Sequence, residues 1–457
     1  MAVWSDRPAV IAHRLSLPFG PNVEGCFVDG GSLIVYGFRG KHFVVVNAST
    51  EQELFSVECG GAHRIWSFSP SRTGEGGTFV WNQASTLKLY SAMGLSHRIV
   101  RSGGHGRELK AAAACPSDPC VVATGAEDTT IRIFEHTTHN GAQSDFRCVR
   151  VLRKHVTGIQ HLAWSEDGRY LFSSGGYEEF FVWRIRRLPV IGLGVVCEAV
   201  CPPESELPDL RIMSFAVREG SSSKTRVSDD EFIVTLVYSD STIRTYSYTS
   251  TPSAKIFNLI HVGTYLTSCL TQTIHLSTSL LLTAGTDGQI AFWPLPSPTT
   301  APSDADPSDP LPLTFISRTR LHQSTIKSLA HIALSHTTTL LLTAGDDNAI
   351  AFTLLHQATT DNSDPPDTST LLIPRAHAAT ITGAVLLAAP ANATEHETRL
   401  FAVTSGSDQR VKVWAIAVSL DRATEGVEAL RVTRVGDEGT AVADVSDVRH
   451  RHRRTER

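Results

Sequence analysis

The sequence predicts an all-β fold of the propeller type, in which small antiparallel sheets stand around a common axis as blades. Three observations predict it. One short pattern recurs along most of the chain, its copies end at intervals close to the length of a four-stranded blade, and apolar and polar residues alternate within the copies as they do in strands. The 457 residues, 41% of them hydrophobic and 19% charged, are ordinary for a folded protein with a large core.

The recurring pattern is a small turn residue, then an aspartate, then an alternating segment that ends on an aromatic residue. It is clearest at 406–414, which ends on Trp414. Two weaker copies have lost the aspartate and carry Tyr177 and Ala84 at that place. Five copies keep it, and we call these residues the repeat aspartates: Asp128, Asp240, Asp287, Asp347 and Asp408.

The spacing of the copies is typical of WD-repeat blades. Such blades are about 40–45 residues long, and insertions lengthen some copies. We therefore expect a WD-repeat β-propeller of seven blades, with the eighth copy, at the N-terminal end, as an extra blade or part of a neighbouring propeller. The eight copies end at residues 47, 90, 134, 183, 246, 293, 353 and 414.

The composition along the chain predicts where the propeller begins and ends. We expect an N-terminal segment at 1–29, the propeller at 30–420 and a C-terminal tail at 421–457 that is basic at 449–457. The basic run is either a solvated end or a contact for RNA or an import receptor. Segments rich in Pro, Ser or Asp are expected to be disordered insertions near 218–231, 294–312 and 361–367.

Each repeat aspartate is expected to tighten a turn and to bond a histidine at the start of its blade, such as His155, His322 or His377. We interpret these pairs as scaffolding and not as catalytic dyads. In one blade the pattern predicts a strand at 155–164 and a second strand at 170–174.

Several classes of function are disfavoured. The net charge is −5, and because the last nine residues contribute +4, the rest of the chain carries −9, which is not typical of a stand-alone nucleic-acid binder. Eight scattered cysteines predict neither a zinc site nor an oxidising compartment, so we expect a cytoplasmic protein. No phosphate loop, H-E-x-x-H or G-x-S-x-G motif is present, and no apolar run is long enough to span a membrane. We expect no catalytic site, cofactor, metal or membrane contact.

Three stretches depart from the repeat pattern, and we interpret them as parts of a partner-docking rim. Arg, Trp and Tyr anchor many protein interfaces. The alternative, packing of strands and turns with a solvated Arg–Glu pair, stays open. The candidate partner-binding residues are His63, Arg64 and Trp66 in the first stretch, His105, Arg107 and Glu108 in the second, and Tyr177 and Glu178 in the third.

The sequence resembles the WD repeat-containing protein 6 family. The resemblance rests, in this order, on 35–38 with 41–45, on 59–68, on 105–108 with 127–130, and on 407–410 with Trp414. It implies a non-catalytic partner of a tRNA ribose 2′-O-methyltransferase that modifies the wobble nucleotide of the anticodon. The methyl donor would then bind the methyltransferase, and tRNA would be contacted through the complex. Family members are longer, and this chain is expected to correspond to their C-terminal half.

Two other functions remain open. The chain could be a general interaction scaffold, for example a ubiquitin-ligase substrate receptor or a trafficking adaptor, because a propeller alone does not determine function. A propeller enzyme would need a polar cluster in the central channel.

Overall fold

A computed structural model describes residues 2–4, 11–15, 17–19, 22–29, 31–71, 76–92, 104–139, 143–205, 209–220, 230–251, 254–296, 309–357, 365–388, 397–419 and 430–440. These residues form strands and loops and contain no helix. The described residues accordingly include no helix long and apolar enough to cross a membrane. The all-β prediction is confirmed.

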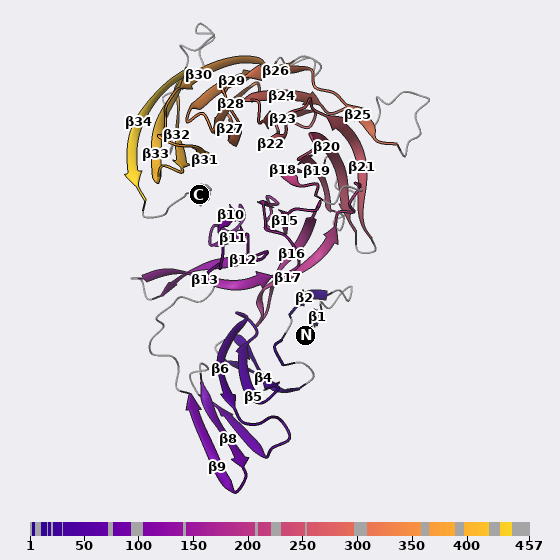
Figure 1. Ribbon diagram of the computed structural model, residues 1–457, viewed down its shortest axis with the longest axis vertical. Coiled ribbons are helices and arrows are strands. Elements are labelled where there is room, and N and C mark those ends of the chain that lie inside the picture. Colours follow the sequence, from indigo (N-terminus) through magenta and orange to yellow (C-terminus); the bar gives the residue numbers. More distant parts are fainter. Residues whose placement is uncertain are drawn as a thin grey trace.

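Six sheets follow one another in an arc, which we call the six-sheet arc (Figure 1). Its first three sheets contain β10 (Leu109–Ala114), β11 (Val121–Ala126), β12 (Ile131–His139) and β13 (Gln143–Leu152); β14 (His161–Trp164), β15 (Tyr170–Ser174), β16 (Phe180–Leu188) and β17 (Gly192–Val200); and β18 (Ile212–Glu219), β19 (Asp230–Tyr238), β20 (Thr242–Ser250), β21 (Lys255–Thr264) and β25 (Leu311–Leu313).

The last three sheets of the arc have four strands each. They contain β22 (Leu270–His275), β23 (Leu280–Gly285), β24 (Gln289–Pro294) and β26 (Ser317–Arg320); β27 (Ile326–Ala333), β28 (Thr338–Gly345), β29 (Ile350–His356) and β30 (Asp367–Ile373); and β31 (Ile381–Ala388), β32 (Glu397–Gly406), β33 (Arg410–Ser419) and β34 (Leu430–Gly439).

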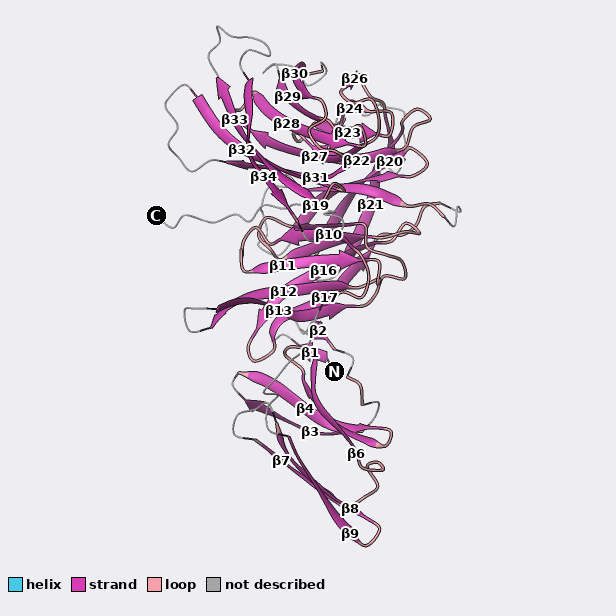
Figure 2. Ribbon diagram, turned by 60° about the vertical axis from the view of Figure 1, so that its left-hand side comes forward, coloured by secondary structure: helices cyan, strands magenta, loops and turns pink. Residues whose placement is uncertain are grey.

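Two further sheets project from the arc as a separate pair, which we call the two-sheet unit (Figure 2). The first has four strands and the second has three. They contain β3 (Val23–Asp29), β4 (Ser32–Arg39), β5 (His42–Asn47) and β6 (Gln52–Glu58), and β7 (Trp66–Pro70), β8 (Gly77–Gln83) and β9 (Thr86–Ala92). A short hairpin of β1 (Ala2–Trp4) and β2 (Ile11–Arg14) lies beside β17.

The repeats and the sheets correspond one to one. Every copy of the pattern ends on the third strand of its sheet, from Asn47 on β5 to Trp414 on β33. Strands pair antiparallel in chain order, with β25 as the parallel exception. In the arc, the first strand of each sheet lies against the first strand of the next, so β10, β14, β18, β22, β27 and β31 form the inner surface. Buried apolar clusters fill the spaces between neighbouring sheets.

The arc contains six of the eight repeats, where we expected seven in one ring. The repeats that end at Asn47 and Tyr90 pair with each other instead, through a dense aromatic cluster. Phe43 and Phe79, both completely buried, stack with their ring centroids 4.0 Å apart. Trp66 packs edge-on against Phe38. Aromatic pairs of this kind add to the stabilisation gained by burying the rings, which favours this pairing of the two sheets.

Several expected boundaries differ from the observed ones. β3 begins inside the expected N-terminal segment 1–29, and β34 lies inside the expected tail 421–457, where it completes the last sheet. The insertions also begin and end in strands: residues 218–219 and 230–231 extend β18 and β19, which pair with each other as a hairpin. The central parts of the expected insertions and the basic run 449–457 lie outside the described residues.

The two-sheet unit and the β1–β2 hairpin are attached to the arc by buried polar contacts. Arg150 on β13 is completely buried and donates to the backbone oxygens of Leu193 (2.6 Å) and Ser49. His13 on β2 is also buried, and its Nδ1 lies 3.0 Å from the backbone oxygen of Val195. Burial and the nearby Arg150 charge lower the pKa of His13 to about 4. The Arg150 bonds satisfy backbone oxygens of the arc and of the two-sheet unit at once, and the His13 contact ties the β1–β2 hairpin to β17.

Candidate partner-docking face

One hydrogen-bonding geometry recurs in several sheets of the arc and ties the turns of one face to the core. In the last sheet, His377 Nδ1 donates to Asp408 (3.0 Å), and its Nε2 accepts from Thr404 Oγ1 (2.8 Å). Trp414 Nε1 then donates to the same Thr404 oxygen (3.0 Å). Asp408 also accepts from the backbone amide of Ala378 (3.0 Å). Every polar atom of the imidazole is thereby used inside the scaffold.

Other sheets repeat this geometry with variations. His322 bonds Asp347 (2.9 Å) and Thr343 (2.9 Å) in the same way. Asp287 instead accepts from the hydroxyl of Tyr265 (2.9 Å). Asp240, which is exposed, bonds the backbone amide and hydroxyl of a residue two positions later and so stabilises only its own turn.

One scaffold residue was missed by the sequence reasoning. Glu179, and not the residue at the expected place, bonds His155 Nδ1 (2.9 Å) in the second sheet of the arc. The longer glutamate side chain reaches the histidine from a turn in which Tyr177 and Glu178 both have left-handed φ angles of 56° and 57°. The sequence signal that could have indicated an acidic partner in this turn was His155, six residues before β14. Because it turns inward to make this bond, β14 begins only at His161.

Electrostatics favour a structural role for these pairs. Burial lowers the pKa of His377, so the imidazole is neutral at pH 7. Burial opposes a low pKa at Asp408, but the hydrogen bonds from His377 and from the Ala378 amide outweigh it and lower the pKa of that carboxyl. Among the described residues, no group of three or more His, Cys, Asp or Glu side chains is arranged to hold a metal ion.

The structure separates the first candidate stretch from the other two. His63, Arg64 and Trp66 belong to the two-sheet unit, whose sheets project from the arc (Figure 2). His63 is exposed, Arg64 Nη1 lies 3.5 Å from the Asn82 backbone oxygen, and Trp66 packs into the aromatic cluster. The left-handed φ of Gly60 (92°) explains the glycine before this stretch, since a Cβ there would collide with the Arg64 side chain.

Two of the candidate residues are buried and make scaffold contacts. His105 bonds Asp128 (3.0 Å), so it holds the scaffold position of the first sheet in the arc. Glu178 pairs with Arg244 (3.2 Å) and accepts from the Glu204 backbone amide (2.9 Å). The side chain of Glu178 is only 4% exposed, which leaves little of it for a partner.

The remaining candidates gather on one face of the first two sheets of the arc. Arg107 and Glu108 are exposed in the segment that enters β10. Tyr177 is 55% exposed in the turn between β15 and β16, and Leu109 and Val156 are 45% and 72% exposed beside them. We call these five residues the turn-face patch.

Backbone contacts make the turn-face patch continuous. The Glu127 amide donates to the Glu108 oxygen (3.0 Å), and the Ile159 amide donates to the Ala126 oxygen (3.1 Å), which joins the two sheets. Within the second sheet, Thr157 Oγ1 accepts from the Gly176 amide (2.7 Å) and so holds Val156 near Tyr177. An exposed tyrosine beside apolar side chains and an arginine has the composition of an interface anchor.

Comparison with known proteins agrees with this fold. The family model described as WD domain, G-beta repeat, matches residues 146–183. The chain is 24% identical over 472 residues to the tRNA (34-2'-O)-methyltransferase regulator WDR6 of Rattus norvegicus, which covers 84% of this chain and 40% of the relative. The Homo sapiens protein of the same name is 24% identical over 475 residues, covering 85% and 40%. The chain therefore spans two fifths of the length of these relatives. Among solved structures, the RRP9 WD40 repeats align with a TM-score of 0.47 and 15% identity over 77% of this chain and 85% of that chain.

Proposed function

We propose that this chain is a non-catalytic WD-repeat adaptor that binds a tRNA ribose 2′-O-methyltransferase and supports methylation of the anticodon wobble nucleotide. The observation that carries the proposal is the similarity to proteins named as regulators of a tRNA 34-2'-O-methyltransferase, which extends over 84% of this chain. The histidine–aspartate pairs support a non-catalytic role. Both imidazole nitrogens of a pair such as His377–Asp408 are hydrogen-bonded in the interior, so no lone pair is left for acid–base chemistry.

The proposed docking surface for the methyltransferase is the turn-face patch. Tyr177 supplies an amphipathic ring, Val156 and Leu109 supply exposed apolar area, and Arg107 and Glu108 supply charges for orientation. S-adenosylmethionine is proposed to bind the methyltransferase, and tRNA to be held by the complex. The proposed location is the cytoplasm; in support, none of the eight cysteines forms a disulfide, and thiols stay reduced there.

Affinity capture of the tagged chain from its own cells tests this proposal. A 2′-O-methyltransferase is expected among the captured proteins. Val156→Asp is expected to weaken its capture at least about tenfold, because a charge would enter the centre of the interface. Val435→Asp is the matched control, since Val435 is 56% exposed on β34, outside the turn-face patch. Capture of a cullin adaptor or of coat proteins without any methyltransferase would instead favour the general scaffold.

A further inference from the structure

A cavity of about 400 Å³ lies on the opposite face of the arc from the turn-face patch. It is bounded by residues at or near the C-terminal ends of the inner strands β14, β18, β22 and β27: Trp164, Arg218, Thr273, His275 and His331. The turn-face patch lies where β10 and β14 begin, so the two surfaces are separated by the length of the inner strands.

Four polar atoms of this cavity are buried and have no partner among the described residues: Thr273 Oγ1, Arg218 Nε and the two ring nitrogens of His275. The side chain of Thr273 belongs to a residue that is only 3% exposed, and its Oγ1 makes no hydrogen bond. Arg218 donates through its terminal nitrogens to the backbone oxygens of Glu219 (3.4 Å) and Thr278 (3.1 Å), but its Nε is buried without an acceptor. Buried polar atoms are nearly always bonded, so these unused donors in one cavity indicate a missing acceptor.

The charges around the cavity restrict what that acceptor can be. Burial, with the nearby Arg218 charge, lowers the pKa of His275 to about 3, and burial lowers the pKa of His331. Both imidazoles are neutral at pH 7. Arg218 is therefore the one cation in the set of Trp164, Arg218, Thr273, His275 and His331. Glu166 and Glu219 also line the cavity and are exposed at its rim. This arrangement suits a single negative charge inside and positive charges outside.

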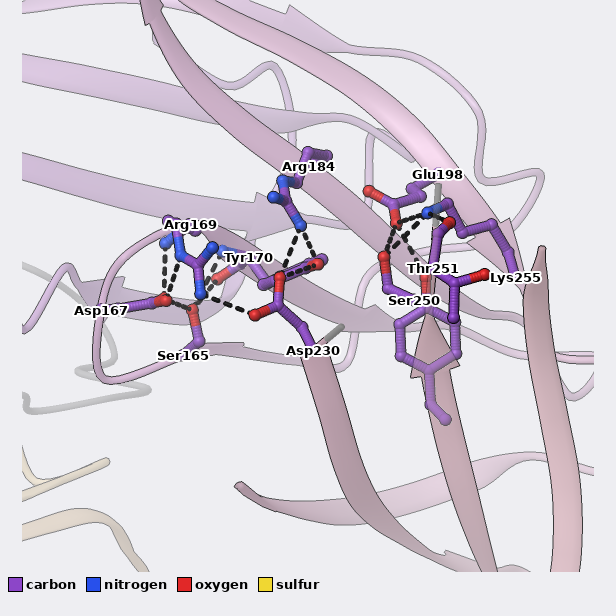
Figure 3. A network of polar contacts seen from close by, with 11 residues as sticks. Ser165, Asp167, Arg169, Tyr170, Arg184, Glu198, Asp230, Ser250, Thr251 and Lys255 are labelled. Carbon is purple, nitrogen blue, oxygen red and sulfur yellow. Dashed lines mark hydrogen bonds and ion pairs between the residues drawn. The ribbon is translucent and has the colours of Figure 1, made fainter. Parts of the chain in front are cut away.

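The turn after β14, whose Ser165 and Glu166 line the cavity, is tied to the neighbouring sheet by a polar network. Ser165 donates to Asp167 (2.7 Å), and Arg169 donates to Asp230 (2.7 Å) on the neighbouring sheet (Figure 3). Arg184 reaches the same Asp230 carboxylate (3.0 Å). A wall fixed by such a network loses little conformational entropy when a ligand binds.

We propose that this cavity binds an acidic side chain of a peptide segment that carries basic residues on either side. The carboxylate accepts from Arg218 Nε and Thr273 Oγ1, the aliphatic part of the side chain packs on Trp164, and the basic neighbours meet Glu166 and Glu219 at the rim. RNA fits less well, because its repeated phosphates would meet both rim glutamates and a chain of net charge −5. The site is independent of the methyltransferase proposal.

A polar cavity in this position is also where a propeller enzyme would have its active site. An activated nucleophile needs a base within hydrogen-bond distance, and among the described residues Thr273 Oγ1 makes no hydrogen bond, not even to the neutral imidazole of His275 two residues along β22. The described geometry therefore favours ligand binding over catalysis.

Fluorescence anisotropy with the full chain tests the proposal. The probe is a fluorescein-labelled peptide of sequence Ala-Lys-Leu-Glu-Leu-Lys-Ala, compared with the same peptide carrying Gln in place of Glu. The Glu peptide is expected to bind about tenfold more tightly, since a charged hydrogen-bonded pair is lost in the Gln peptide. Thr273→Val and Arg218→Gln are expected to reduce that preference, and Arg211→Gln, an exposed residue before β18, is the matched control that keeps it.

Thr273→Val is expected to fold normally, because the hydroxyl that it removes has no partner to leave unpaired. The thermal unfolding midpoint of this variant should match that of the unaltered chain. Equal affinity for the two peptides, absence of binding, or an equal loss in Arg211→Gln would overturn the proposal. Displacement of the peptide by oligouridine or inorganic phosphate would overturn it too, because the site would then recognise phosphate.

Discussion

Replacing a repeat aspartate should cost very different amounts of stability in two sheets of the same arc. Asp408 is 6% exposed and accepts hydrogen bonds from the buried His377 (3.0 Å) and from the Ala378 amide (3.0 Å). Asp408→Ala leaves the imidazole Nδ1 unpaired in the interior, at a cost of about 3 kcal/mol. Asp240 is exposed and bonds only within its own turn, so Asp240→Ala should cost about 1 kcal/mol or less.

Urea unfolding at pH 7, followed by circular dichroism, measures both losses, and amide hydrogen exchange in β33 and β20 reports each sheet separately. Asp408→Ala should speed exchange in β33 far more than Asp240→Ala speeds exchange in β20. Equal losses for the two variants would show that the stabilisation comes from the turn and not from the bond to the buried histidine.

Three further outcomes follow from the attachment of the β1–β2 hairpin and the two-sheet unit to the arc, and from the core of the two-sheet unit. The pKa of His13 is about 4 in the folded protein and 6.5 in the unfolded chain, so the stability that the neutral imidazole contributes is present above pH 6.5 and is lost as the pH falls towards 4. The free energy of unfolding should fall by about 2 kcal/mol between pH 7 and pH 5. His13→Gln should flatten this pH dependence of urea unfolding. Arg150→Met should leave the backbone oxygens of Leu193 and Ser49 unpaired and speed the tryptic release of the two-sheet unit; an unchanged digestion rate would contradict this. Phe79→Ala should destabilise the two-sheet unit by about 3–5 kcal/mol and leave hydrogen exchange in β28 unchanged, whereas a loss shared by the whole arc would contradict its separate core.

The repeats could be predicted because their signals are local. The turn, the aspartate and the aromatic residue of a copy such as 406–414 lie within one hairpin, so the sequence spacing alone locates the third strand. The choice of which sheets share the arc could not be predicted in this way. It depends on packing between separate repeats, as in the contact of Phe43 with Phe79, and no periodicity reports such contacts.

The candidate site was predictable only in part. Arg107, Glu108 and Tyr177 are exposed as a docking surface requires. Glu178 is buried because its partner, Arg244, comes from another sheet 66 residues away. The cavity on the opposite face was not foreseen, because Trp164, Arg218 and Thr273 come from three different repeats. Whether the exposed candidates bind a partner stays a prediction.

Reconstitution with purified components tests whether the chain supports methylation as a non-catalytic partner. The chain and the 2′-O-methyltransferase that it captures are purified separately, and ribose methylation of nucleotide 34 is measured in unmodified tRNA with S-adenosylmethionine. We expect no methylation by the chain alone, weak methylation by the methyltransferase alone, and a strong gain when both are present. Val156→Asp should reduce that gain. Methylation by the chain alone, or no gain from adding it, would show that the chain is not a non-catalytic partner of the methyltransferase.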